Sequence, residues 1–304
     1  MSLISIIIPA YNAERFLRET CRSLLAQTCP HWEALIIDDG SQDATADVAR
    51  AFCAQDGRFH LISQANAGVS AARNAGIDAA HGDFIAFLDA DDMWEPSAVA
   101  QFLDMFTSCP EVDIVWSDAI RFDSVTGKTR PVIWKNYLAT GDPWLDMLIH
   151  HYIPISGVCC RASLLTPDMR WRTDITHGED RDFLLRILRN HTARKLAIPI
   201  LHSREHAASA SHNAQAALQG EQAVMREHLA DVGIPRRIRR RAWSALAFRC
   251  AVISAFVAHD PLAAMRWYAL AVFRDPLNIN NYLLPLRKAF LSLTHRQHAQ
   301  NSSI

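Results

Sequence analysis

The residues best suited to chemistry in this chain are carboxylates that follow a short apolar run. The run Phe84–Leu88 leads directly into Asp89, Ala90, Asp91 and Asp92. Two carboxylates at positions i and i+2 beyond a strand end can both reach one hard divalent ion, which takes oxygen ligands. The alternative is that these aspartates cap the helix that follows. The spacing predicts a site for a divalent ion at Asp89 and Asp91.

Two further segments place polar groups where a nucleotide could bind. Asp38 and Asp39 follow the run Ala34–Ile37 and could accept hydrogen bonds from a nucleobase N–H or a ribose hydroxyl, although a turn before the next helix is also a good interpretation. Arg73 lies one turn into a helix that opens after Gly68, and the N-terminus of a helix attracts anions. Arg73 is therefore either a fixed positive charge for a phosphate or a solvated surface arginine.

These groups need a scaffold, and the first 120 residues predict one. Short apolar runs alternate with segments of helical length and periodicity. The runs are Leu3–Ile8, Ala34–Ile37, Phe59–Ile62, Phe84–Leu88 and Asp113–Trp116. Because strand and helix alternate, we expect an α/β fold with a mainly parallel, Rossmann-like central sheet and helices on both faces. Such sheets bind ligands beyond the carboxyl ends of their strands, where the carboxylates, Tyr11 and Asn12 all fall.

The remainder of the chain changes character at about residue 212. Residues 121–212 are irregular apart from one clear helix at Glu179–Leu188. From residue 213 the pattern is helical throughout, and Asp-Pro and Gly-x-Pro steps separate its segments. These segments lie near 214–231, 236–258, 261–273 and 278–293. We therefore expect three parts, at 1–120, 121–212 and 213–304, the last wholly helical.

Taken together, these segments resemble the inverting glycosyltransferases of family two, which share the GT-A fold. The resemblance covers roughly residues 3–212 in the family's order and spacing. The matching stretches are SIIIPAYN at 5–12, LIIDDGSQDAT at 35–45, NAGVSAARNAG at 66–76, GDFIAFLDADDMWEP at 82–96, GEDRDFLLR at 178–186 and, more loosely, HSREHAASAS at 202–211. The Q-x-x-R-W motif of the processive synthases is absent from the sequence, which favours a non-processive enzyme of the bacterial type.

The resemblance implies a function and a division of labour. A hexosyltransferase would move one sugar from a nucleotide-diphospho-sugar, expected to be a UDP-sugar, to a saccharide or lipid-linked acceptor with inversion, in the biosynthesis of cell-surface polysaccharides or glycans. Residues 1–120 would form the nucleotide-sugar-binding half of the GT-A domain, and 121–212 the acceptor-binding and catalytic half. The alternative function is an inactive scaffold that acts through its helical tail, and intact Asp89, Asp91 and Asp180 argue against it.

The same resemblance assigns residues to the donor. The donor-binding residues would be Pro9, Ala10, Tyr11, Asn12, Asp38, Asp39, Arg73, Asp89 and Ala90. Asp89 and Asp91 would hold Mn²⁺ or Mg²⁺ against the diphosphate. His206 matches a histidine that approaches the metal from the C-terminal side, although the chain holds fourteen histidines and an accidental loop residue is the alternative.

Catalysis and acceptor binding would fall to the second half of the domain. Asp180 matches the catalytic base, and a base that deprotonates the acceptor hydroxyl typically contributes about 10²–10⁴-fold. Its alternative is a carboxylate placed at a helix N-terminus by the helix dipole, and Glu179 and Asp182 compete with it. The acceptor and donor sugar would meet the segment from Gly157 to Arg161, together with Glu179 and Trp171. Trp171 could stack on a sugar face or pack in the core.

The charge of the chain is unevenly distributed. The net charge of −1 excludes a uniformly basic nucleic-acid-binding protein, but residues 1–100 carry −8 and residues 226–304 carry +8. Five of the basic residues are Arg236, Arg237, Arg239, Arg240 and Arg241. We expect no nucleic-acid partner and a peripheral contact of the arginines of 236–249 with an anionic membrane surface. The apolar face of the same helix is expected to pack in a helical hairpin.

The remaining patterns bear on location. Seven cysteines without C-x-x-C spacing predict reduced thiols. The apolar N-terminus has no basic segment and stops at Pro9, so we interpret it as a buried strand and not as a signal peptide. No apolar stretch reaches the length of about 20 residues that a membrane span needs. We therefore expect a cytoplasmic protein that can associate with the inner face of the membrane, and the sequence does not indicate its oligomeric state.

Overall fold

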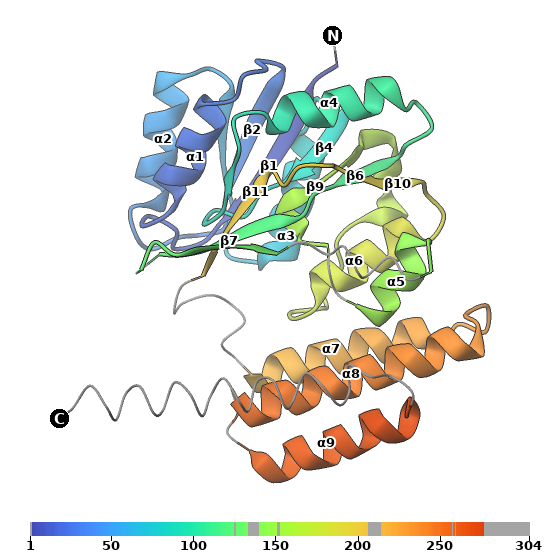
Figure 1. Cartoon of the computed structure of the whole chain (residues 1–304). Helices are drawn as coiled ribbons and strands as arrows, with labels where there is room; N and C mark the ends of the chain where they lie inside the picture. The colour runs from blue at the N-terminus through green and yellow to red at the C-terminus, as the bar shows by residue number, and fades with distance from the viewer. Residues whose placement is uncertain are drawn as a thin grey trace, which may run out of the picture. The chain divides into compact units, whose positions relative to one another are not determined.

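The computed structural model describes residues 2–124, 126–132, 140–150, 153–205, 214–256, 258 and 260–276. The chain divides into two compact units (Figure 1). The first comprises Met1–Met147 and His151–Ala210, and the second comprises Leu148–His150 and Ser211–Ile304.

A seven-stranded sheet in the order β10-β6-β9-β4-β1-β2-β3 forms the centre of the first unit. Its strands are β1 (Ile4–Ala10), β2 (Trp32–Asp38), β3 (Phe59–Ser63), β4 (Phe84–Phe87), β6 (Ile114–Trp116), β9 (Val158–Arg161) and β10 (Ala193–Lys195). Neighbouring strands are parallel except β9, which runs antiparallel to both β4 and β6. The predicted α/β fold with a mainly parallel sheet is confirmed.

Helices pack against both faces of this sheet because its strands are apolar on both faces (Figure 1). Every position of β2 is buried, and so are six of the seven positions of β1. The helices of the first unit are α1 (Leu17–Leu25), α2 (Thr45–Gln55), α3 (Val69–Ala79), α4 (Ala98–Ser108) and α6 (Glu179–Leu188). A further helix, α5 (Pro143–Ile149), begins in the first unit and ends in the second. Gly76 lets α3 approach β1 closely, since a Cβ there would lie 2.5 Å from Cγ2 of Ile7. This contact fixes the position of α3, which carries Arg73.

A second, four-stranded sheet fills part of the region that looked irregular in sequence. Its order is β5-β11-β7-β8, with β5 (Met93–Trp94), β7 (Ala119–Asp123), β8 (Thr129–Val132) and β11 (Leu201–Glu205). β11 is parallel to β7 and antiparallel to β5. Because β5 directly follows the run Asp89–Asp92, this sheet brings β11 against the acidic turn.

The second unit contains the helices α7 (Ala214–Leu229), α8 (Arg236–Phe256) and α9 (Pro261–Arg274). α8 and α9 form a hairpin, in which the hydroxyl of Ser244 donates to the carbonyl of Ala271 at 2.8 Å. Leu246 and Cys250 on the apolar face of α8 are buried, as expected for the hairpin. The helix expected at 278–293 lies outside the described residues.

The structure also bears on the cysteines and on the membrane-spanning potential of the helices. All seven cysteines are free thiols. Among the described helices, none combines the length and the apolar character that crossing a bilayer requires.

Candidate active site

The polar residues that follow β1, β2 and β4 lie at one edge of the central sheet. These three strands are parallel neighbours, with Ala10 paired to Asp38 and Ile7 paired to Phe87. Their carboxyl ends therefore meet, and the groups that follow them form the candidate site.

Tyr11 and Asn12 form the turn that leaves β1. Tyr11 is 51 % exposed, whereas Ala10 before it is buried. Asn12 has a φ of 49°, a left-handed conformation that asparagine tolerates, and its amide donates to the hydroxyl of Ser41 at 3.0 Å. Pro9 lies within β1 and is half-buried. Tyr11 and Asn12 are both exposed, so both residues of this turn can meet a ligand.

Asp38 and Asp39 are both buried and both hold loops. Asp38 accepts a hydrogen bond from the backbone amide of Ser41 at 3.1 Å. This contact closes a turn, as expected if Asp38 has a structural role. Asp39 accepts three hydrogen bonds of 2.7–2.9 Å from the loop between β3 and α3. The donors are Gln64 Nε2 and the amides of Ala67 and Gly68. Asp39 thereby fixes the start of α3, and its contact with a donor stays a prediction.

Arg73 is buried, so it is not a solvated surface arginine. Its guanidinium lies 2.9 Å from Asp89 Oδ1 and 3.6 Å from Glu179 Oε1, and its side chain is 4 % exposed. The guanidinium carbon sits 4.3 Å from the centre of the Trp171 ring. Within the described structure, Nε and Nη1 of Arg73 make no hydrogen bond. A buried cation with two unsatisfied N–H donors is suited to receive an anion.

Trp171 belongs to the core beneath Arg73. Its ring stacks on Phe183 at 4.1 Å and meets Phe87 edge-on at 5.3 Å, and the residue is 2 % exposed. Asn74 accepts from its backbone amide and donates to its carbonyl. The stacking of Trp171 on a sugar is therefore corrected: both ring faces are already covered, one by Phe183 and one by the Arg73 guanidinium, and the residue supports Arg73.

The turn Asp89–Asp92 is held by hydrogen bonds to its backbone. Ser156 Oγ accepts from the amide of Asp89 at 3.1 Å, and Thr20 Oγ1 donates to the carbonyl of Ala90 at 2.8 Å. Asp92 is buried, and α4 begins only at Ala98, so Asp92 does not serve as a cap for that helix. The turn is therefore held from two segments that are distant in sequence, at Thr20 and at Ser156.

Arg204 on β11 contacts this turn through both its backbone and its side chain. Its amide donates to Asp92 Oδ1 at 3.0 Å, and its Nε donates to the carbonyl of Asp91 at 2.9 Å. Its Nη2 reaches Glu19 Oε2 at 2.5 Å. The guanidinium lies between Phe16 and Phe122, at 4.9 and 4.5 Å from the ring centres. No pattern in the sequence signalled this role, because a single arginine in a polar strand has no periodicity that reveals its partners.

The concentration of like charge in the site shifts two pKa values. Burial, with the Asp91 and Asp89 carboxylates nearby, raises the pKa of Asp92 well above its ordinary value. Burial and the neighbouring Asp180 raise the pKa of Glu179, and the Arg73 guanidinium opposes that rise. Negative charge at this edge is thus unfavourable until a cation offsets it.

The donor set of the turn fits a divalent ion that completes its shell with ligand oxygens. Asp89 is 34 % exposed and Asp91 is half-buried, so both are accessible. The described residues contain no cluster of three or more histidine, cysteine or acidic side chains that could enclose a metal. Mg²⁺ commonly binds through one or two carboxylates together with substrate phosphates, which matches an open pair of aspartates. His206, the expected additional ligand, lies outside the described residues.

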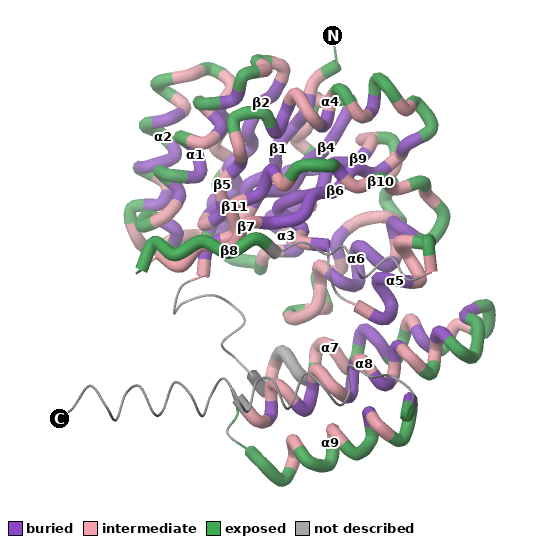
Figure 2. Tube along the Cα trace, in the orientation of Figure 1, coloured by how far each residue is buried: buried purple, intermediate pink, exposed green. Residues whose placement is uncertain are grey.

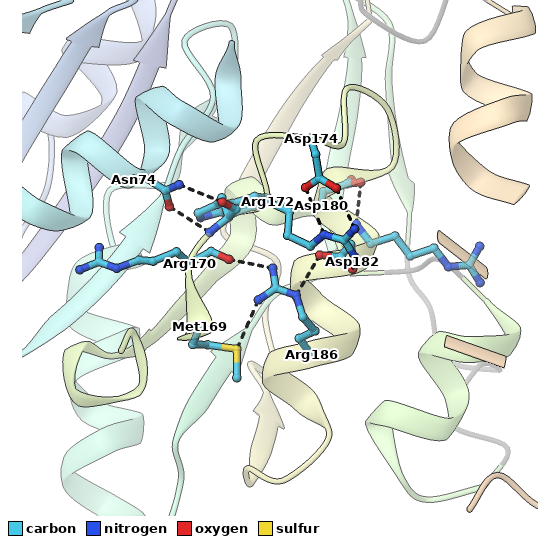
Figure 3. A network of polar contacts seen from close by, with 10 residues as sticks. Asn74, Met169, Arg170, Arg172, Asp174, Asp180, Asp182 and Arg186 are labelled. Carbon is cyan, nitrogen blue, oxygen red and sulfur yellow. Dashed lines mark hydrogen bonds and ion pairs between the residues drawn. The ribbon is translucent and has the colours of Figure 1, made fainter. Parts of the chain in front are cut away.

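Three carboxylates open α6, and one of them has a structural role. Gly178 precedes the helix with a left-handed φ of 84°. Asp182 is 1 % exposed and lies 2.8 Å from Arg186 Nε and 3.7 Å from Arg172 Nη1 (Figure 3). Asp180 accepts from the amide of Arg181 at 2.7 Å, a contact that orients its carboxylate at the first turn. Asp182 is therefore buried between two arginines, whereas Asp180 and Glu179 are only half-buried at the start of α6.

The structure separates the two ends of the predicted sugar-binding segment. Gly157 lies next to the carboxyl end of β6, where its carbonyl accepts from the amide of Ser117 at 3.0 Å. Arg161 pairs with Phe84 at the beginning of β4, because β9 runs antiparallel to its neighbours. Its guanidinium donates to the carbonyls of Val112 and Pro110. The assignment of Arg161 to the sugar site is therefore wrong, since it lies at the opposite edge of the sheet.

The mainly parallel, Rossmann-like sheet with an acidic turn after its central strand, β4, is the architecture of the GT-A fold. The family model described as glycosyl transferase family 2 matches residues 5–165, which is more than half of the chain. The chain therefore belongs to glycosyl transferase family 2.

Relatives in sequence match over the same region. EpsH of Bacillus subtilis (strain 168), a provisionally named glycosyltransferase, is 42 % identical over 127 residues, or 41 % of this chain and 36 % of the relative. TuaG of the same organism, provisionally named for teichuronic acid biosynthesis, is 39 % identical over 110 residues, or 35 % of this chain and 44 % of the relative. The match thus spans less than half the length of these relatives.

Solved structures share the fold at low sequence identity. Residues 1–349 of TarS from S. aureus, in complex with UDP-GlcNAc, superpose with a TM-score of 0.63 at 16 % identity, covering 92 % of this chain and 89 % of that one. The mannosyltransferase PcManGT from Pyrobaculum calidifontis, in complex with GDP-Man and Mn²⁺, gives 0.63 at 18 % identity, covering 96 % and 81 %.

Proposed function

We propose that this protein transfers one hexose, with inversion, from a nucleotide-diphospho-sugar to a saccharide or lipid-linked acceptor in the biosynthesis of a cell-surface polysaccharide. The observation that carries the proposal is the buried Arg73 guanidinium beside the acidic turn, whose Nε and Nη1 make no hydrogen bond among the described residues. A diphosphate supplies the anionic oxygens that would satisfy these donors. The neighbouring structures were obtained with UDP-GlcNAc and GDP-Man, and a UDP-sugar is the donor we favour.

A divalent ion, Mn²⁺ or Mg²⁺, belongs to the proposal. Asp89 and Asp91 would hold it, and His206 would add a third ligand. A bound divalent ion offsets the negative charge that builds on the leaving diphosphate. Asp89 also pairs with the Arg73 guanidinium at 2.9 Å, so the proposed ion and Arg73 would lie on either side of this carboxylate.

Remaining roles in donor binding follow from position. The exposed ring of Tyr11 would contact the base, beside Pro9, Ala10 and Asn12. Asp38 and Asp39 would lie beside the base and ribose. Each carboxylate oxygen has more than one lone pair, so both residues could accept hydrogen bonds from the donor in addition to those from their loops.

We assign the catalytic base to Asp180. Inversion requires a single attack from the face opposite the leaving group, so one carboxylate must remove the proton of the acceptor hydroxyl. Asp182 is buried between Arg172 and Arg186, whereas Asp180 is half-buried in the first turn of α6 and within reach of an acceptor. Glu179 lies against Arg73, 3.6 Å from its Nη1. In this proposal, Glu179 and Gly157 would lie near the transferred sugar.

The test is a panel of UDP-, GDP- and dTDP-sugars with Mn²⁺ or Mg²⁺, read as metal-dependent release of nucleoside diphosphate. The Asp180→Asn variant is expected to lose about 10²-fold or more in rate while donor affinity stays within twofold, as for general-base catalysis. Asp174→Asn is the matched control, because that carboxylate is 69 % exposed. A folded protein that neither binds nor cleaves any of these donors would establish the scaffold alternative instead.

We further propose a cytoplasmic location with contact to an anionic membrane surface. The arginines that open α8 support this, and Arg236, Arg237 and Arg240 among them are exposed. Arg249 does not belong to this group, because it pairs with Glu221 at 3.3 Å. The contact is therefore expected through residues 236–241.

A further inference from the structure

The outward face of α9 is apolar, which is unusual for a helix exposed to water. Seven large apolar side chains are exposed in the described part of the chain, and four of them lie on this helix. They are Leu262 (69 %), Met265 (68 %), Leu270 (36 %) and Phe273 (82 %), here called the α9 surface. Figure 2 shows the run of exposed positions along α9. Their spacing at i, i+3, i+8 and i+11 puts them on one side of the helix.

The exposure does not come from a helix that has failed to pack. The opposite side of α9 contacts α8, where Ala271 is fully buried and its carbonyl accepts from Ser244. Asp260 caps the N-terminus by accepting from the amide of Ala263 at 2.9 Å. α9 is thus docked on one side and apolar on the other, and contiguous exposed apolar surface marks a site of interaction.

Positive charge lies on α9 and beside the Phe273 end of the α9 surface. The sequence of α9 contains Arg266 and Arg274 and no acidic residue. The basic start of α8 lies at the same end of the hairpin as Phe273, because Arg240 reaches Asp275 Oδ1 at 3.6 Å. Val232, in the turn before α8, is 94 % exposed at that end.

This charge pattern favours a lipid surface over a second copy of the chain as the partner of the α9 surface. A second copy of the chain docked through this same surface would bring arginine against arginine, since residues 226–304 carry a net charge of +8. An anionic lipid surface instead offers both an apolar layer for the leucines and phenylalanine and negative headgroups for the arginines. Arg266, on the apolar side, can lay its methylene stem along that layer and keep its guanidinium among the headgroups.

We propose that α9 is a membrane-inserting interfacial helix, whose Leu262, Met265, Leu270 and Phe273 enter the outer part of an anionic bilayer while the arginines of α8 and α9 bind its headgroups. This inference rests on the membrane contact proposed above and specifies it. It turns a purely electrostatic contact into an amphipathic anchor, which would hold the enzyme where a lipid-linked acceptor resides.

The experiment is flotation of the full-length protein with vesicles of phosphatidylcholine alone or mixed with phosphatidylglycerol, without donor or acceptor. The variant combines Leu262→Ser, Met265→Ser and Phe273→Ser, which all replace exposed side chains, and circular dichroism verifies its fold. We expect wild type to bind the anionic vesicles and to retain part of that binding at about 1 M salt, where the Debye length is ~3 Å. The triple variant should bind about tenfold or more weakly, and what remains should vanish in salt.

Two controls and three contrary outcomes complete the test. Ile198→Ser removes a 63 % exposed apolar side chain of the first unit and should leave binding unchanged. Arg236→Ser with Arg237→Ser should weaken binding at low salt only. Wild type that binds no vesicles, or a triple variant that binds as wild type does, overturns the inference. If the wild type is a dimer that binds no vesicles, and the triple variant is a monomer, the partner of the α9 surface is a second copy of the chain. A protein that transfers sugar but ignores vesicles refutes this inference alone and leaves the proposed activity standing.

Discussion

Replacing Arg204 by methionine tests how the acidic turn is held in place. The substitution keeps the backbone amide that donates to Asp92, and it keeps an apolar stem between Phe16 and Phe122. It removes the hydrogen bond from Nε to the carbonyl of Asp91 and the ion pair with Glu19. The turn then loses its link to β11 on the side of Asp91, one of the two proposed metal ligands.

The expected loss of stability follows from the burial of each contact. A buried hydrogen bond from a charged donor contributes about 1.5–3 kcal/mol. The pair with Glu19 adds at most about 1 kcal/mol, because that carboxylate is 51 % exposed and screened by water. We expect Arg204→Met to lower the free energy of unfolding by about 2–4 kcal/mol.

Urea unfolding and metal-dependent UDP binding measure the two effects separately. Arg121→Met is the matched control on the adjacent strand, because Arg121 also pairs with a glutamate, Glu205, but both side chains are more than 40 % exposed. It should cost about 0–1 kcal/mol. Arg204→Met should also weaken UDP binding in the presence of Mn²⁺ about fivefold or more, because Asp91 is no longer fixed, and should leave metal-free binding nearly unchanged.

The outcome that refutes this reasoning is an Arg204→Met protein that matches Arg121→Met in stability and wild type in metal-dependent UDP binding. A loss of stability with unchanged binding would show that Arg204 supports the fold but does not position Asp91. Arg204→Lys separates charge from geometry, since an ammonium group cannot donate to Asp91 and Glu19 in the planar arrangement of a guanidinium.

Three further predictions concern titration, burial and thiol chemistry. The folded state raises the pKa of Glu179 above its ordinary 4.5, so the ionised form of this residue destabilises the fold. Glu179→Gln should therefore raise the urea midpoint of unfolding at pH 8. That gain in stability should shrink as the pH falls toward 4.5. A gain that instead grows in acid would contradict the sign of the shift. Asp182→Asn should cost about 3–5 kcal/mol by leaving Arg186 and Arg172 without their buried partner, whereas Asp174→Asn should cost nothing measurable by the same assay. Burial raises the pKa of Cys160 to about 12, so iodoacetamide at pH 8 should not label this residue in the native protein, and rapid labelling seen by peptide mass mapping would contradict its burial.

The sequence predicted the sheet well where the pattern reflects burial on both faces. Runs such as Phe84–Leu88 are continuously apolar, and strands of that kind are recognisable without knowledge of their neighbours. The helices α3, α6 and α9 begin within a residue of their predicted starts, because Gly68, Gly178 and the Asp260-Pro261 step mark those points.

The sequence could not predict direction or long-range contact. The segment Val158–Arg161 has the composition of any buried strand, and only its insertion between β4 and β6 makes it antiparallel. That direction removes Arg161 from the site. Arg204 and Ser156 escaped notice for a related reason: each acts on a turn more than 60 positions away, through contacts that local periodicity does not encode.

Calorimetric titration of UDP, with and without Mn²⁺, into wild type and Arg73→Met tests most directly whether this edge of the sheet is a diphosphate site. Wild type is expected to bind UDP more tightly with Mn²⁺. Arg73→Met should bind about tenfold or more weakly, because a charge-assisted hydrogen bond contributes about 1.5–3 kcal/mol and each 1.4 kcal/mol is tenfold. Arg50→Met, at a 62 % exposed arginine, should bind as wild type does. An Arg73→Met protein with wild-type UDP affinity would contradict the account.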